Sequence, residues 1–182
     1  MSLKKTAAAF LAISMVFAGC SGSQQKTKAE EEKNNVADAV NAEQEKAKQV
    51  FEAYEGKYTS KEISIDDSGT KIYGKMYLPK EEQSSYPLVI MSHGVGGNFE
   101  NCEPYAKMFA ANGFMAIAYD FQGGGPASKS DGAMKDMTVL TEAQDLDVVL
   151  AYVLTLETTQ KDNVFLFGES QGGFVSSYVG AH

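Results

Sequence analysis

Ser170 lies between two glycines in the stretch Gly168-Glu169-Ser170-Gln171-Gly172. A Gly-x-Ser-x-Gly pattern presents a serine hydroxyl on a sharp turn from a strand into a helix, where side chains at the glycine positions would collide with the neighbouring segments. The apolar run NVFLF precedes the pattern and the helix-compatible run GFVSSYV follows it. A serine presented in this way attacks carbonyl carbons and forms an acyl intermediate. We therefore predict that Ser170 is a nucleophile, the alternative being a glycine-rich loop without chemistry.

A second glycine-rich stretch, SHGVGGN at residues 92–98, follows an earlier apolar run. Acyl transfer passes through a tetrahedral intermediate whose oxyanion needs two N–H donors. The residue after the nucleophile, here Gln171, usually supplies one donor, and we expect Val95, directly after His93 and Gly94, to supply the other. Because His93 sits at the strand end ahead of this donor, we expect it to hold the loop by a side-chain hydrogen bond and not to act as the catalytic base.

Hydrophobic periodicity outlines the elements that must position these residues. Two alternating segments joined by DDSGT predict a β-hairpin, and three short apolar runs predict strands of a sheet that is covered on both faces. Helical spacing separates those runs, and the longer helix carries an apolar stripe that includes Leu140 and Leu146. Strands are expected at residues 59–65, 71–79, 86–93, 114–121 and 163–168, and helices at residues 100–112 and 137–157. A hairpin followed by βαβαβ predicts an α/β fold with a parallel sheet and right-handed crossovers.

The stretches HGVGGN, AYDFQGGG, MTVLTEAQDLDVVLAYV and GESQGG, in this order, resemble the α/β-hydrolase fold. More narrowly, they are similar to bacterial serine esterases of the feruloyl/cinnamoyl type and to serine aminopeptidase-like hydrolases. The resemblance runs from about Ile63 to the C-terminus. It implies the N-terminal portion of that fold, with Ser170 as the nucleophile and the N–H groups of Val95 and Gln171 as oxyanion donors. It also implies a small-molecule ester or a peptide as substrate, and no cofactor.

The loop after the second apolar strand departs from these relatives. They often carry an Arg-Gly-His-Gly pattern there, whereas this chain has FQGGG at residues 121–125. The contacts that such an Arg and His make are therefore not expected. Asp120, at the end of the strand, is interpreted as a carboxylate that caps the loop and not as the acid of a triad.

The acid and the base that a serine nucleophile needs are not evident. The family order is Ser, then Asp or Glu, then His, but His182 lies about 18 Å along the helix that starts at Ser170. We therefore expect an incomplete sheet with one side of the Ser170 strand exposed, in a C-terminally truncated hydrolase that is inactive as it stands. Two alternatives stay open, a peptidase of the same fold and a non-catalytic surface-binding lipoprotein.

The N-terminus is expected to be a targeting segment. Two lysines precede a mostly apolar run that is too short to span a bilayer and is typical of a signal peptide. The run ends in FAGC at residues 17–20, which resembles the bacterial lipoprotein signal, in which the cysteine receives lipid. We predict a signal peptide at residues 1–19, lipidation of Cys20 and anchoring on the extracytoplasmic face of a bacterial membrane. The alternative is an ordinary signal peptide with an incidental cysteine.

The remaining divisions follow from composition. Residues 20–56 are expected to form a polar, flexible tether up to about Lys28 and then a helix from Ala29, and residues 57–182 to form the partial hydrolase domain. The formal net charge of −8 and the pI of about 4.8 argue against nucleic acid as a partner. With Cys20 lipidated, Cys102 has no disulfide partner and is expected to be a small, partly buried residue.

Overall fold

The computed structural model describes residues 23–182, so the expected signal peptide at residues 1–19 and the lipidation site Cys20 lie outside the described residues. The chain divides into two units, one that ends at Glu45 and a second that spans Lys46–His182. No helix of the described part is long and apolar enough to cross a membrane. The domain limits expected at residues 19 and 56 stay predictions.

Helix α1 (Ser23–Glu52) begins before the expected start at Ala29. Most of the segment predicted to be a flexible tether is therefore helical. The composition gives the reason, because residues 24–28 are mostly Gln and Lys, which are good helix formers.

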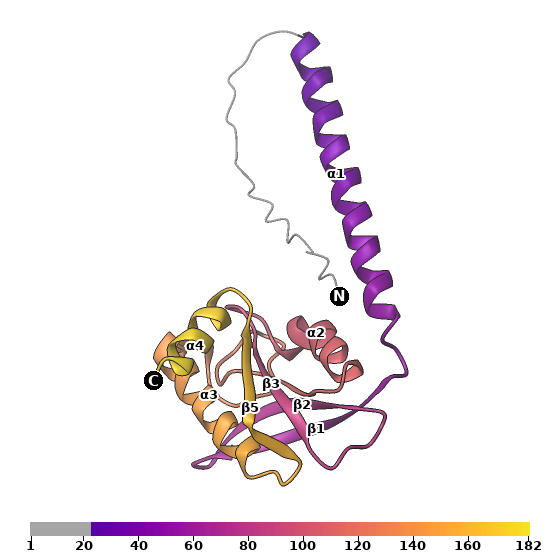
Figure 1. Ribbon diagram of the computed structural model, residues 1–182. Coiled ribbons are helices and arrows are strands. Elements are labelled where there is room, and N and C mark those ends of the chain that lie inside the picture. Colours follow the sequence, from indigo (N-terminus) through magenta and orange to yellow (C-terminus); the bar gives the residue numbers. More distant parts are fainter. Residues whose placement is uncertain (1–22) are drawn as a thin grey trace. The chain divides into compact units, whose positions relative to one another are not determined.

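Five strands form one mixed sheet in the second unit (Figure 1). They are β1 (Tyr58–Asp67), β2 (Thr70–Pro79), β3 (Tyr86–Ser92), β4 (Met115–Tyr119) and β5 (Thr159–Gly168), and their order across the sheet is β1-β2-β4-β3-β5. Strand β3 pairs in parallel with β4 and β5, as predicted for strands that alternate with helices. Strand β2 pairs antiparallel with β4. The expected α/β architecture is confirmed, with the hairpin added on one side of the parallel strands.

The predicted hairpin is formed by β1 and β2. Ser68 and Gly69 at its tip have φ angles of 53° and 92°, the two positive values that a two-residue type I′ turn needs. The register pairs Ile65 with Ile72, and both side chains are buried together with Ile63. Because successive side chains of a strand point to opposite faces, this register sends the isoleucines into the core and the polar residues between them to solvent.

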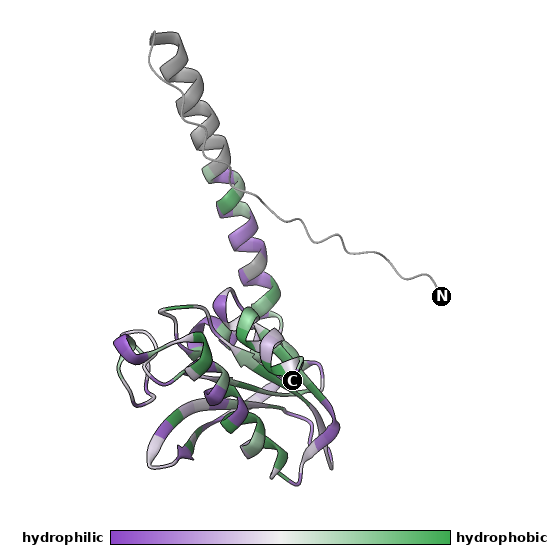
Figure 2. Ribbon diagram, turned by 90° about the vertical axis from the view of Figure 1, so that its left-hand side faces the viewer, coloured by the Kyte–Doolittle hydropathy of each residue, from purple (hydrophilic) through white to green (hydrophobic). Residues whose placement is uncertain are grey.

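Helices cover both faces of the sheet (Figure 1). Helix α2 (Phe99–Ala111) packs on one face, and α3 (Val139–Leu154) and α4 (Gln171–Gly180) pack on the other, while the short 3₁₀ helix η1 (Met134–Asp136) lies in the connecting loop. Hydrophobic and hydrophilic residues are interspersed along the helices and strands (Figure 2), and the buried hydrophobic residues form two clusters. The core therefore has two layers, one on each side of the sheet.

Strand β5 lies at the edge of the sheet, where only β3 pairs with it in the described chain. Phe165 on this strand is 51% exposed, so the prediction of a third buried strand is wrong for its outer residues. The expectation that one side of the Ser170 strand is exposed is confirmed. The prediction that Leu140 belongs to the buried apolar stripe is also wrong, because this residue is 63% exposed in the first turn of α3.

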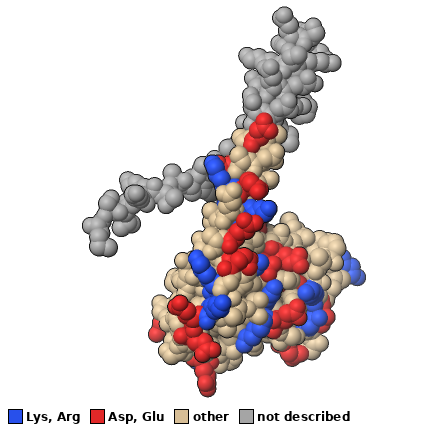
Figure 3. All heavy atoms as spheres, turned by 90° about the vertical axis from the view of Figure 1, so that its right-hand side faces the viewer, with Lys and Arg blue, Asp and Glu red and all other residues tan. Residues whose placement is uncertain are grey.

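Charged side chains of both signs share the surface (Figure 3). Lys75 lies 3.0 Å from Glu103, and Lys107 lies 3.5 Å from Glu55 and 3.9 Å from Glu103. On the face shown in Figure 3, acidic and basic groups are intermixed and do not form a patch of one sign.

The two leucines of α3 give a matched test of this packing. Leu146 is fully buried in the layer beneath α3, so Leu146→Ala should lower the free energy of unfolding by about 3 kcal/mol. Leu140→Ala removes the same atoms from an exposed position and should change it by less than about 0.5 kcal/mol. Urea unfolding followed by circular dichroism measures both, and equal effects would contradict the packing described.

Candidate active site

Ser170 occupies the turn between β5 and α4. Its backbone has a φ of 51° and a ψ of −118°, and within the described chain it shares a positive φ with only one other non-glycine residue, Ser68. Such a conformation costs on the order of 1–3 kcal/mol and persists where the surrounding structure imposes it. Ser170 is exposed to solvent at the carboxyl end of β5. The strained turn that the Gly-x-Ser-x-Gly pattern predicts is therefore present.

Close packing requires glycine on both sides of this turn. A Cβ atom at Gly172 would collide with the carbonyl groups of Ser92 and His93 at the end of β3, and a Cβ atom at Gly168 would collide with the backbone of Gly172. In addition, the N–H of Glu169 donates to the carbonyl of Ser92 at 3.0 Å. The turn is thus held directly against the end of the neighbouring strand.

The loop after β3 lies against Ser170. A Cβ atom built on Gly94 would lie only 3.3 Å from Cβ of Ser170. The loop turns tightly, because the N–H of Gly97 donates to the carbonyl of Gly94 at 3.1 Å and Gly96 has a φ of 70°. The N–H of Gly125, from the loop after β4, donates to the carbonyl of Gly97 at 3.1 Å. Two loops therefore pack together beside the serine.

Val95 and Gln171, the predicted oxyanion donors, lie on two different elements next to Ser170. Gln171 is the first residue of α4, and the first N–H groups of a helix have no acceptor within that helix. Val95 is 63% exposed and directly follows Gly94. Neither N–H donates to an acceptor among residues 23–182. Both groups are therefore available to a bound oxygen atom.

His93 is buried at the end of β3, and both of its ring nitrogens are engaged. Nδ1 lies 2.8 Å from the carbonyl oxygen of Gly94, and Nε2 accepts from the N–H of Phe121 at 3.2 Å. This arrangement requires the proton on Nδ1, which donates to Gly94. Burial lowers the pKa of His93, so the ring is neutral. The expected hydrogen bond to the loop is confirmed, and neither nitrogen is left to act as a base for Ser170.

Asp120 caps two segments, as interpreted from the sequence. Its Oδ1 accepts from the N–H of Phe99 at 2.6 Å, at the start of α2, and its Oδ2 accepts from the N–H of Lys129 at 2.7 Å. Burial raises the pKa of Asp120, and the two backbone hydrogen bonds offset part of the rise. The carboxylate therefore joins the loop after β4 to the start of α2.

Two buried carboxyl groups on α3 are absent from the residues that the sequence singles out. Oε2 of Glu142, a fully buried residue, accepts from Nε2 of Gln171 at 2.7 Å, and Oδ2 of Asp145 accepts from the N–H of Gln122 at 2.7 Å. Burial raises the pKa of both groups, that of Asp145 to about 7, and the carboxylates of Asp67 and Glu142 add to the rise at Asp145. Both positions fall on the three- and four-residue spacing of the apolar stripe, a signal that could have placed them on the buried face.

The other candidate groups lie away from Ser170. His182 is exposed beyond the end of α4, where its Nδ1 lies 2.8 Å from the carbonyl oxygen of Tyr178. Cys102 is fully buried on α2, and burial raises the pKa of its thiol to about 12, so no thiolate forms near neutral pH. Among the side chains that the structure describes, no group of three His, Cys, Asp or Glu residues is placed to hold a metal ion.

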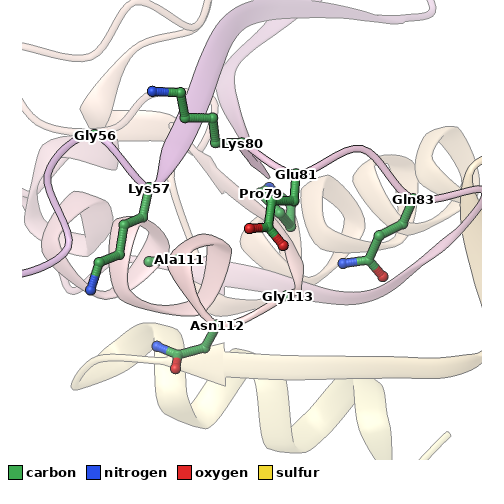
Figure 4. Close-up of a pocket in the computed structure, with 9 residues that line it drawn as sticks. All are labelled: Gly56, Lys57, Pro79, Lys80, Glu81, Gln83, Ala111, Asn112 and Gly113. Carbon is green, nitrogen blue, oxygen red and sulfur yellow. The ribbon is translucent and has the colours of Figure 1, made fainter.

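A pocket of about 460 Å³ lies at the opposite end of the sheet (Figure 4). Pro79 ends β2 and Gly113 precedes β4, which places the pocket at the amino ends of the parallel strands. Ligands of open α/β sheets bind outside the carboxyl ends of the strands, where Ser170 lies. This pocket is therefore not part of the candidate site. It is lined by Gly56, Lys57, Pro79, Lys80, Glu81, Gln83, Ala111, Asn112 and Gly113.

The mixed sheet, the helices on both faces and the serine turn after β5 define the α/β-hydrolase fold. The chain belongs to the family described as serine aminopeptidase, S33, whose model matches residues 83–182. The matched region includes the loop with Val95, the turn with Ser170 and the helix with Glu142. The resemblance to this fold and to serine aminopeptidase-like hydrolases is confirmed.

Known relatives are esterases and other hydrolases, and they are longer than this chain. The complex of Est1E from Butyrivibrio proteoclasticus with ferulic acid is 27% identical with a TM-score of 0.60, over 65% of this chain and 47% of that one. An acetyl xylan esterase from Paenibacillus sp. R4 is 22% identical with a TM-score of 0.57, over 69% and 45%, which shows the fold alone. The quorum-quenching protein AidA of Acinetobacter baumannii (strain MDR-ZJ06) is 24% identical over 113 residues, 62% of this chain and 36% of that protein. The chain thus spans less than half the length of these relatives.

Asp145 gives a prediction for the dependence of stability on pH. Its pKa of about 7 in the folded state lies above the ordinary 3.8, so the folded state binds this proton more tightly than the unfolded state does. The group therefore lowers the free energy of unfolding as the pH rises from about 4 to about 7. Asp145→Asn should remove this decline and raise the free energy of unfolding by about 4 kcal/mol at pH 8, since each unit of pKa difference corresponds to about 1.4 kcal/mol.

Urea unfolding between pH 4 and pH 8 measures the effect of Asp145→Asn. Asp147→Asn, on the exposed side of the same helix, is the matched control and should leave the curve unchanged. The free energy of unfolding of the wild type should fall relative to that of Asp145→Asn as the pH rises from 4 to 7. A constant difference between the two proteins over this range would contradict the prediction.

Proposed function

We propose that the chain carries the nucleophile half of a serine hydrolase that acts on carboxylic esters. The observation that carries this proposal is the exposed Ser170, held at a φ of 51° between β5 and α4, with the loop of Gly94 packed against it. A strained and exposed serine beside two available N–H donors suits acyl transfer. A protein that only binds a partner does not need this arrangement, which disfavours the non-catalytic alternative.

The proposed reaction has two steps. Oγ of Ser170 attacks the ester carbonyl carbon and transfers its proton to a general base, and the N–H groups of Val95 and Gln171 bind the oxyanion that forms. The intermediate collapses, the alcohol leaves with a proton, and the acyl group stays on Ser170. Water then attacks the carbonyl carbon of the acyl group, the carboxylic acid is released, and the hydroxyl group of Ser170 is restored.

We place the general base and its acid outside residues 1–182. The chain has two histidines, and both are engaged away from the serine: His93 in the loop after β3 and His182 beyond α4. The relatives are more than twice as long as the part that this chain matches, and in this fold the acid and the histidine follow the serine in the chain. On this proposal the 182-residue chain by itself is inactive.

Ferulic acid bound to Est1E supports a carboxylic ester as the substrate class of this chain as well. The family description, serine aminopeptidase, supports a peptide as the second candidate. Both substrate classes form an acyl-enzyme at Ser170, so the mechanism does not distinguish them. A comparison of the rates at which one preparation hydrolyses an aminoacyl p-nitroanilide and a p-nitrophenyl ester tells which class is preferred.

The first test compares the 182-residue chain with the product of the uninterrupted genomic reading frame that contains it. The longer product should hydrolyse p-nitrophenyl esters, and Ser170→Ala should lower its kcat by at least about 10³-fold because the nucleophile is lost. The 182-residue chain should stay at the background rate. Turnover by the 182-residue chain that disappears in Ser170→Ala would show that a working base lies within it.

We also propose that Cys20 is lipidated and tethers the hydrolase unit to the outer face of a bacterial membrane. The FAGC sequence after a short apolar run supports this. In cells that process lipoproteins, the wild-type chain should incorporate radiolabelled palmitate and partition into detergent, and Cys20→Ser should do neither. Equal labelling of the two chains, or release of both into the medium, would contradict lipidation at Cys20.

A further inference from the structure

Glu142 has one carboxylate oxygen without a partner. Its side chain is fully buried, and Oε1 forms no hydrogen bond within the described residues. A buried acceptor left unpaired destabilises the fold, whereas an apolar side chain of similar shape at the same place does not carry this penalty. The unpaired oxygen of Glu142 is therefore not explained by stability.

The other oxygen of Glu142 reaches the candidate site. Oε2 accepts from Nε2 of Gln171 at 2.7 Å, across the contact between α3 and α4. Gln171 directly follows Ser170 and carries one of the two available N–H groups. Glu142 is itself fixed in the first turns of α3, where its N–H donates to the carbonyl of Thr138 and the side chain of Thr138 caps the helix. One hydrogen bond therefore joins a fixed point on α3 to the start of α4.

We propose that Glu142 is a positioning residue that holds the side chain of Gln171 and thereby fixes the direction of the Gln171 N–H beside Ser170. This inference rests on the proposed function, in which that N–H binds the oxyanion. Oxyanion donors must be held close to their productive geometry, because their contribution comes from being in place before charge develops. Without the hydrogen bond to Glu142, the side chain of Gln171 would no longer tie the start of α4 to α3.

Asp145, one turn further along α3, makes the corresponding contact on the other side of the site. It accepts from the N–H of Gln122, at the start of the loop after β4. The same loop donates from Gly125 to Gly97, in the loop that carries Val95. Glu142 thus contacts α4, which carries the N–H of Gln171, and Asp145 contacts a loop that is bonded to the loop of Val95. Both proposed oxyanion donors are therefore connected to α3, which favours a positioning role for this part of the helix.

The first test separates positioning from stability. Glu142→Leu removes the unpaired oxygen, which favours stability, and also the acceptor of Gln171 Nε2, which opposes it, so its Tm should stay close to that of the wild type. The second-order rate of fluorophosphonate labelling of Ser170 in the longer product should nevertheless fall at least tenfold. Glu142→Gln keeps an acceptor for Gln171 and should stay within threefold of the wild type. Glu157→Leu, an exposed glutamate just beyond α3, is the matched control and should leave the rate unchanged. A Glu142→Leu rate equal to that of Glu157→Leu would overturn the proposal.

The second test is spectroscopic and needs no activity. In ¹⁵N-labelled 182-residue chain, the backbone N–H and the side-chain amide of Gln171 should both shift with the titration of Glu142, and neither should titrate in this way in Glu142→Gln. Backbone and side-chain signals that do not respond to Glu142 would overturn the proposal even if Glu142→Leu failed to fold. If wild-type Ser170 is never labelled while these signals respond, the proposed function fails and the coupling between Glu142 and Gln171 stands.

Discussion

The candidate site depends on the contact between the turn after β5 and the end of β3. The backbone of Gly172 lies so close to the carbonyl groups of Ser92 and His93 that no Cβ atom fits, and the N–H of Glu169 donates to Ser92. This approach forces Ser170 into its positive φ and places the start of α4 beside the loop after β3. The strain at the serine is therefore balanced by packing elsewhere, as expected where a turn is held for function.

Side chains behind this contact keep the loops in place. His93 is buried and spans from the loop after β3 to the backbone of Phe121. Asp120, the residue before Phe121, joins the loop after β4 to the start of α2. The carboxyl groups of α3 act from the other face of the sheet, where Glu142 meets α4 and Asp145 meets the loop after β4. The exposed serine thus rests on a set of buried polar groups, and nearly all of their hydrogen-bonding atoms have partners.

The sequence predicts the fold and the serine turn because both depend on local patterns. Alternation, apolar runs and paired glycines predict where the strands lie in the sequence and the turn at Ser170 without knowledge of distant contacts. The side chains behind the site could not be predicted with the same ease. Glu142 and Asp145 are two of the three charged residues of α3, and the third, Asp147, is exposed, so charge alone does not tell which of them are buried. Their partners are on α4 and in the loop after β4, far away in the sequence. Leu140 shows the converse, because an apolar residue on the stripe stays exposed in the first turn.

A buried carboxyl group close to the proposed oxyanion site poses an electrostatic problem. The start of α4 favours negative charge, and an ionised Glu142 bonded to Gln171 would oppose the charge that develops there. Burial raises the pKa of Glu142, and the hydrogen bond from Gln171 offsets part of the rise. A protonated carboxyl group still accepts the amide of Gln171 through its carbonyl oxygen, so it can hold Gln171 while adding little charge. On the proposed function, burial of Glu142 therefore shifts the group toward the form that opposes an oxyanion least, while its hydrogen bond to Gln171 is kept.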